Sequence, residues 1–169
     1  MTLEETVSAL GGARHVVVTG GEPLLQQEGL AALFGMLDAK VFVEVETNGT
    51  LAPLPSLAER ANQWNVSPKL GNAGETEARR LRYDVLEQFA KLDNAWLKLV
   101  VDGEERVTEA RLLAERLAWP PLRVMLMPEA QTKAELEERE GLVARACAAH
   151  GFRYSPRLHV QLWGLRRGI

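Results

Sequence analysis

Two kinds of apolar pattern alternate along the chain. Short runs made mostly of apolar residues predict buried strands, and stretches in which apolar residues recur every three or four positions predict amphipathic helices. The predicted strands cover residues 15–19, 41–45, 63–66, 95–101, 122–127 and 158–163. Each of the first five is followed by a polar or glycine-containing segment and then, in most cases, by a helical pattern.

Helix ends are marked by capping residues. Thr2 and Glu5 have capping-box spacing ahead of a short opening helix, which Gly11-Gly12 would end. Thr132 and Glu135 have the same spacing ahead of a long helix that runs to about residue 150. Further helices are predicted at residues 30–37, 54–61, 82–91 and 110–117.

The alternation of strands with helices predicts an α/β fold. A connection between parallel strands has to be long enough to carry a helix, so the pattern favours a parallel sheet with helices packed outside it. About six strands suit an open or incomplete barrel better than a closed barrel of eight. A doubly wound open sheet is the alternative, and periodicity does not separate the two.

Composition narrows the class of protein. The chain has 169 residues, of which 46% are hydrophobic, enough for one substantial core. A formal net charge of -3 gives no general attraction to nucleic acid or to acidic lipid. No apolar stretch approaches the roughly 20 residues of a membrane helix, and the start is unlike a signal peptide, so we expect a cytoplasmic protein. Cys147 is the only cysteine, which excludes a site built from several thiolates.

Polar residues follow three of the predicted strands. These segments are Thr19-Gly20-Gly21-Glu22-Pro23, Glu46-Thr47-Asn48-Gly49-Thr50 and Ser67-Pro68-Lys69. In parallel α/β folds the loops at the carboxyl ends of the strands share one face, where active sites form. We therefore expect the three segments to converge on one site.

The first of these segments suits a zwitterionic ligand. Gly20 and Gly21 would let the backbone approach the ligand, and Glu22 adds a carboxylate for an ammonium group. The alternative is a tight turn in which Glu22 only complements the N-terminus of the next helix.

The surrounding sequence gives these residues a family resemblance. The segment from Val16 to Gln26, with Gly20-Gly21-Glu22 at its centre, resembles the S-adenosylmethionine (SAM) binding segment of radical SAM enzymes. Four further segments make the whole similar to the 7-carboxy-7-deazaguanine synthase family, from about Val16 to Gly168. They are Glu46-Thr47-Asn48-Gly49-Thr50, Ser67-Pro68-Lys69, Leu126-Met127-Pro128-Glu129 and the tail from Ser155 to Gly164 that contains His159.

The resemblance implies an activity and a fold. Members of that family convert 6-carboxy-5,6,7,8-tetrahydropterin to 7-carboxy-7-deazaguanine with loss of ammonia, on the way to queuosine and other deazapurines. They use SAM, a [4Fe–4S] cluster and Mg²⁺. The fold implied is an incomplete (βα)6-type partial TIM barrel, with residues 1–169 forming a single but partial radical SAM core domain.

The resemblance also implies roles for individual residues. Gly20, Gly21 and Glu22 would hold the methionyl end of SAM, and Ser67 and Lys69 its ribose and carboxylate. Glu46, Asn48 and His159 would bind the pterin. Each has an ordinary structural alternative: Lys69 as a surface lysine, Asn48 as part of an Asn-Gly turn, and His159 as a packed side chain.

One feature of the family is missing from this sequence. The family's first strand and the loop after it, with three cluster-binding cysteines and the Mg²⁺ ligand, have no counterpart here, and Cys147 is interpreted as a small buried hydrophobe. We therefore expect a truncated chain that is inactive alone. The alternatives are a relative without a cluster that binds SAM, a pterin or a purine, and a non-catalytic α/β scaffold. A homodimer and a reductant such as flavodoxin are further expectations from the family.

Overall fold

The six strands form one parallel sheet in the computed structural model, which describes residues 2–164 and Arg166. The strands are β1 (His15–Val18), β2 (Phe42–Thr47), β3 (Gln63–Val66), β4 (Ala95–Val101), β5 (Val124–Pro128) and β6 (Arg153–Tyr154). Every neighbouring pair is parallel. The predicted α/β class and parallel sheet are confirmed.

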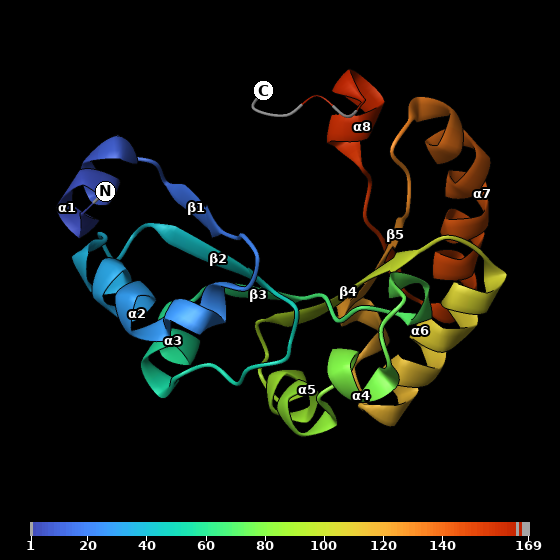
Figure 1. Cartoon of the computed structure of the whole chain (residues 1–169), viewed down its shortest axis with the longest axis horizontal. Coiled ribbons are helices and arrows are strands. Elements are labelled where there is room, and N and C mark those ends of the chain that lie inside the picture. The colour runs from blue at the N-terminus through green and yellow to red at the C-terminus, as the bar shows by residue number, and fades with distance from the viewer. Residues whose placement is uncertain (1, 165, 167–169) are drawn as a thin grey trace.

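The order of the strands decides between the two architectures left open by the sequence. Along the sheet they lie in the order β1 to β6, the same as along the chain. A doubly wound sheet reverses direction at a switch point, and this sheet does not. Because crossovers between parallel strands are right-handed, an order without reversal places the connecting helices on one side. Figure 1 shows a curved sheet with α2, α3, α5, α6 and α7 outside it, as expected for part of a barrel.

The helices lie close to their predicted positions. They are α1 (Leu3–Ala9), α2 (Gln27–Met36), α3 (Pro55–Arg60), α4 (Glu77–Arg80), α5 (Tyr83–Ala90), α6 (Glu104–Arg116), α7 (Lys133–His150) and α8 (Leu158–Trp163), with short 3-10 turns η1 (Pro23–Gln26), η2 (Gly71–Ala73) and η3 (Pro121–Arg123). Both predicted capping boxes are present, at Thr2 with Glu5 and at Thr132 with Glu135. No helix of the described residues is long and apolar enough to cross a membrane.

The two faces of the sheet differ in chemistry. Val45, Trp64 and Leu97 are fully buried on the face that packs against the helices. The intervening positions point to the opposite, concave face, where Glu46 and Lys98 are only partly buried. The alternation follows from the two-residue period of a strand. The concave face of the sheet is therefore polar, and it lies on the inner side of the partial barrel.

The last predicted strand is wrong. Residues 158–163 form α8, and the sixth strand is Arg153–Tyr154, which pairs with Met125 and Leu126 of β5. The alternation of Leu158, Val160 and Leu162 with polar residues favours a strand, but over six residues it does not exclude a helix. Here only Val160 is buried, while Leu158 and Leu162 are exposed on the same side, one helical turn apart. Gly168, where the family resemblance ends, lies outside the described residues.

Two strand boundaries also differ from the prediction. The second strand continues to Thr47, so Glu46 belongs to the strand itself. The fifth begins at Val124, because Pro121–Arg123 forms the turn η3. The first shift is important for the site, since it fixes the direction in which Glu46 points.

Candidate functional site

The three polar segments converge at the carboxyl edge of the sheet, as the sequence predicts. They surround a cavity of about 250 Å³. Its walls are formed by Thr19, Gly20, Gly21, Glu46, Thr47, Asn48, Asn65, Ser67, Lys69, Lys98 and Met127. The cavity therefore contains six of the eight predicted site residues, and the other two, Glu22 and His159, lie outside its wall.

The first wall is backbone. Gly20 has φ of +146°, a conformation that residues with a side chain rarely adopt. A Cβ added at Gly20 or Gly21 would meet no atom within 4 Å, so the space beside this backbone is open. The glycines thus present peptide groups to the cavity without obstruction. This geometry fits a ligand whose polar end is recognised by main-chain groups.

Glu22 stabilises the loop that contains Gly20 and Gly21 through hydrogen bonds. It is 9% exposed, and its Oε1 accepts hydrogen bonds from the Leu24 amide (3.0 Å) and the Thr47 hydroxyl (2.8 Å). Its Oε2 accepts from the Asn48 amide at 2.7 Å. The carboxylate thus caps η1 and joins the loops that follow β1 and β2. A carboxylate has about four acceptor sites, so three internal donors leave room for one from a ligand.

Asn48 is engaged in its own turn. Its Oδ1 accepts from the Thr50 amide (2.9 Å) and the Thr50 hydroxyl (2.6 Å). Gly49 follows with φ of +73°, and a Cβ there would collide with the side chains of Leu86 and Val66. The Asn-Gly turn expected from the sequence is present. Asn48 still lines the cavity, but its carbonyl oxygen already has two donors.

Glu46 lies at the centre of a polar network on the concave face. Its Oε1 accepts from Lys98 Nζ at 3.0 Å, and its Oε2 accepts from the Thr19 hydroxyl at 3.1 Å. The side chain of Lys98 is 20% exposed and that of Glu46 is 35% exposed, so the pair is partly shielded from water. The lysine and the hydroxyl together orient the carboxylate toward the cavity. A second set of acceptor positions on the same oxygens remains open.

Lys98 and Thr19 were missed as site residues by reasoning from sequence. Lys98 occurs within the apolar run of β4, where a lysine suggests only a solvated position. A usable signal was present: Trp96, Lys98 and Val100 alternate with fully buried residues, so they share the concave face with Glu46. Assigning alternate residues of β4 to the two faces of the sheet would have placed Lys98 in the site.

Ser67 and Lys69 form the third wall. The Ser67 amide donates to the Thr47 carbonyl at 2.7 Å, which continues the pairing of β3 with β2 beyond the strand end. Lys69 is exposed, and no hydrogen bond or ion pair of its ammonium group is found among the described residues. A free cation beside a polar cavity can bind an anionic ligand group.

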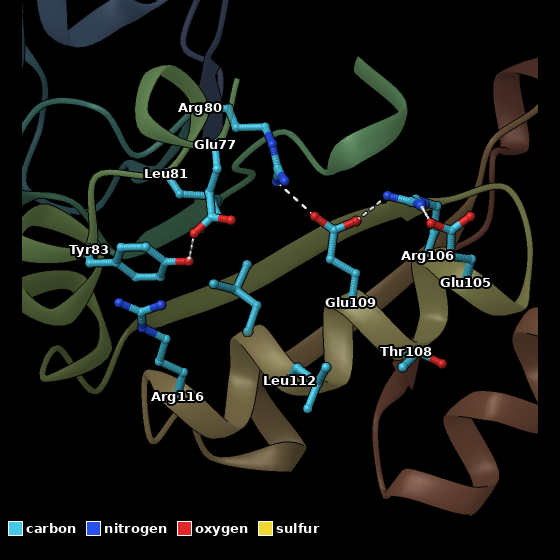
Figure 2. Close-up of a pocket in the computed structure, with 11 residues that line it drawn as sticks. Glu77, Arg80, Leu81, Tyr83, Glu105, Arg106, Thr108, Glu109, Leu112 and Arg116 are labelled. Atoms are coloured by element: carbon cyan, nitrogen blue, oxygen red, sulfur yellow. Dashed lines mark hydrogen bonds and ion pairs between the residues drawn. The ribbon is translucent and has the colours of Figure 1, made fainter. Parts of the chain in front are cut away.

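A larger cavity, of about 500 Å³, lies on the helical side between α4, α5 and α6 (Figure 2). Its charged groups mostly satisfy one another: Glu109 pairs with Arg80 at 2.8 Å and with Arg106. The Tyr83 hydroxyl donates to Glu77 at 2.8 Å, and burial raises the pKa of Tyr83. The Arg116 guanidinium stacks 3.5 Å from the centre of the Tyr83 ring. This cavity is built from paired charges and contains none of the predicted site residues, so we place the site at the smaller one.

The charged groups of this larger cavity also contact the segment that contains Ser67 and Lys69. Arg80 donates to the Lys69 carbonyl at 3.0 Å, and the Gly71 amide donates to Glu109. A Cβ at Gly71 would displace the guanidinium of Arg106, which packs directly against this glycine. The segment that carries Ser67 and Lys69 is thereby fixed to α6.

His159 is not brought to the cavity. It is exposed on α8 and does not line the wall that contains Glu46. Its predicted pairing with Glu46 around a pterin stays a prediction.

The residues present do not fit a [4Fe–4S] cluster. Such a cluster needs several thiolates, and the sequence contains only Cys147. Cys147 is buried on α7, its thiol donates to the Arg153 carbonyl at 3.3 Å, and burial raises the pKa of the thiol, which disfavours the thiolate. Among the described residues, no group of three His, Cys, Asp or Glu side chains is placed to hold a metal ion.

Comparison with known proteins identifies the family. No protein-family model matches the chain. The chain is 40% identical over 172 aligned residues to the 7-carboxy-7-deazaguanine synthase of Pyrobaculum aerophilum, covering 99% of this chain and 75% of that protein. The chain belongs to the 7-carboxy-7-deazaguanine synthase family.

Other members of the 7-carboxy-7-deazaguanine synthase family match over smaller shares of their length. The synthase of Halobacterium salinarum is 38% identical over 89% of this chain, which spans 65% of that protein. The synthase of Escherichia coli (strain K12) is 33% identical over 89% of this chain and 60% of its own length. The family resemblance seen in the sequence is confirmed, and the chain covers between about three fifths and three quarters of these relatives.

Proposed function

We propose that this chain forms the SAM- and pterin-binding part of a 7-carboxy-7-deazaguanine synthase. The reaction is the conversion of 6-carboxy-5,6,7,8-tetrahydropterin to 7-carboxy-7-deazaguanine. The observation that carries the proposal is the single cavity in which Gly20-Gly21, Glu46 and Lys69 meet, in a chain that belongs to this family. Membership supplies the reaction, and the cavity supplies a place for the ligands.

The SAM end of the site is assigned to Gly20, Gly21, Glu22, Ser67 and Lys69. Open peptide groups at the two glycines suit the methionyl ammonium and its neighbours, and Glu22, which follows them in sequence, has one acceptor position left by its three internal donors. Lys69 has no partner among the described residues and suits the methionyl carboxylate, with Ser67 beside it for a ribose hydroxyl. SAM is the radical source for this reaction.

The pterin end is assigned to Glu46 and Asn48, with Lys98 and Thr19 in support, and His159 on α8, which does not line this cavity, is kept as a further contact implied by the family. The amino-pyrimidinone edge of a pterin presents adjacent N–H donors, which a carboxylate accepts in pairs. Glu46 faces the cavity and is held in place by Lys98 and Thr19. A carboxylate anchored in this way prefers a donor-rich ring over a ring that presents acceptors.

Turnover needs thiolates that this sequence does not contain. Cys147 is one buried thiol, so no residue of this chain is assigned to the cluster or to Mg²⁺. The function proposed for this polypeptide by itself is therefore the binding and orientation of SAM and the pterin. A homodimer and an electron donor such as flavodoxin stay predictions from the family.

Titration of the chain with SAM and with 6-carboxypterin in a calorimeter tests the proposal. We expect saturable binding of both, and weaker binding of SAM to Lys69→Gln by about tenfold, as expected for loss of one charged hydrogen bond. Arg79→Gln, which removes an exposed positive charge on α4, is the control. Absence of binding for both ligands would refute the assignment of the cavity.

The single cysteine favours a second candidate function. A member of the family that binds SAM, a pterin or a purine without radical chemistry would also need only the residues found here. Binding measurements do not separate it from the first candidate. Formation of 7-carboxy-7-deazaguanine under reducing, anaerobic conditions does, when it is measured with this chain joined to the cysteine-containing segment of a relative, because only the first candidate takes part in that reaction.

A further inference from the structure

A second cavity adjoins the one assigned to SAM. It measures about 260 Å³ and shares Ser67 and Lys69 with the first. Beyond them it is bounded by Asn72, Glu129 and Arg157, so it extends from the end of β3 toward the segment between β6 and α8. Neither cavity alone reaches the roughly 300–1,000 Å³ usual for ligand pockets, whereas the two together do. Ser67 and Lys69 therefore border both cavities, so a ligand group bound beside Lys69 can be contacted from either one.

Arg157 lines this second cavity with a guanidinium group whose charge is not paired within the described residues. Its Nε is buried and has no hydrogen-bond partner among the described residues. Its guanidinium forms no ion pair with them either. A buried donor without a partner is costly, and such a group in a cavity wall indicates a ligand that supplies the acceptor.

The other charges leave this cavity net positive. Glu129 is the one carboxylate among its lining residues, and its Oε2 already accepts from Asn72 at 2.9 Å. Lys69, like Arg157, has no partner among the described residues. Two cations therefore face a single, partly satisfied anion. The planar guanidinium adds a geometry suited to the two oxygens of a carboxylate, which a lysine alone does not offer.

We propose that Arg157 and Lys69 together form a carboxylate-binding subsite at the junction of the two cavities. This rests on the proposed function, and it adds a ligand-binding residue from the β6–α8 segment. Two ligand carboxylates have the required chemistry, the methionyl carboxylate of SAM and the carboxylate on C6 of the pterin. Bidentate binding by Arg157 would satisfy its buried Nε and would leave Lys69 for a second contact to the same group.

The test compares ligands with and without the carboxylate. Affinities of SAM, decarboxylated SAM, 6-carboxypterin and pterin are measured for the wild-type chain, Arg157→Gln and the control Arg79→Gln. We expect Arg157→Gln to lose about tenfold or more in affinity for one of the two carboxylate ligands and to bind its carboxylate-free partner normally. The pair that shows the difference identifies which carboxylate is bound. Arg157→Lys should recover part of the loss.

A second experiment uses inorganic phosphate as the ligand and does not depend on the proposed function. Phosphate should raise the melting temperature of the wild type and of Arg79→Gln by more than that of Arg157→Gln. If the wild type binds neither SAM nor 6-carboxypterin but phosphate still distinguishes the variants, the proposed function fails and the anion subsite stands. Equal effects of Arg157→Gln on ligands with and without a carboxylate, or equal stabilisation of all three proteins by phosphate, would overturn the subsite.

Discussion

At the scale of single residues, Glu22 stabilises the fold by joining two loops, a role that its position in a predicted ligand-binding loop does not indicate. Its carboxylate accepts from three groups, the amides of Leu24 and Asn48 and the hydroxyl of Thr47. Glu22→Gln would replace one acceptor oxygen by an amide nitrogen that faces another donor. We expect a loss of about 1–3 kcal/mol in the free energy of unfolding, measured by urea denaturation.

Glu87→Gln is the matched control for that measurement, since Glu87 is exposed on α5. If the two variants are equally stable, Glu22 does not tie the loops together. If Glu22→Gln is destabilised and also binds SAM more weakly, the binding loss has to be measured at a temperature where both proteins are fully folded.

Lys98 is expected to act on the pterin through Glu46. Lys98→Met keeps the length of the side chain but removes the donor that holds Glu46 Oε1 at 3.0 Å. We expect affinity for 6-carboxypterin to fall by about tenfold, because a carboxylate that is free to rotate loses its orientation toward the ring. Affinity for SAM should change by less than about twofold.

Lys40→Met, at an exposed position before β2, controls for the loss of charge in the Lys98 experiment. Lys98→Arg should retain most of the affinity for the pterin, since the donor is kept. Unchanged or tighter binding of 6-carboxypterin by Lys98→Met would show that Lys98 competes with the ligand for Glu46 instead of positioning it.

At the scale of elements, the segment after β3 depends on α6. Glu109 accepts from the Gly71 amide and pairs with Arg80, whose side chain is only 9% exposed. Glu109→Gln would leave Arg80 without its counter-charge and loosen the segment that carries Ser67 and Lys69. We expect faster amide hydrogen exchange over residues 67–74, with Glu104→Gln, at an exposed position on the same helix, as the control. Unchanged exchange there would mean that α6 does not hold this segment.

Sequence patterns predicted most elements because the determinants were local. The capping boxes at Thr2 and Thr132, and the runs that became β3 and β4, depend on residues close in sequence. Residues 158–163 were assigned wrongly because Leu158, Val160 and Leu162 alternate with polar residues, a two-residue period that favours a strand, whereas only Val160 packs into the molecule and Leu158 stays exposed. The site was predicted as three loops, whereas Glu46 lies within a strand and its partner Lys98 comes from β4.

At the scale of the whole molecule, strand order is the property that periodicity could not supply. The order β1 to β6 without reversal places the helices outside and leaves a polar concave face, on which Glu46 of β2 and Lys98 of β4 meet across the one strand between them, β3. The family resemblance supplied the barrel before the order was known. The convergence of the carboxyl ends of β1 to β5 explains why residues from 19 to 127 share one cavity.

A crystal structure of the chain with SAM and 6-carboxypterin bound tests the central claim most directly. The account predicts the methionyl end of SAM against Gly20 and Gly21, and the amino-pyrimidinone edge of the pterin against Glu46. Both ligands should lie at the carboxyl edge of the sheet. Ligand density confined to the cavity between α4 and α6, or anywhere else away from the ends of β1, β2 and β3, would contradict it.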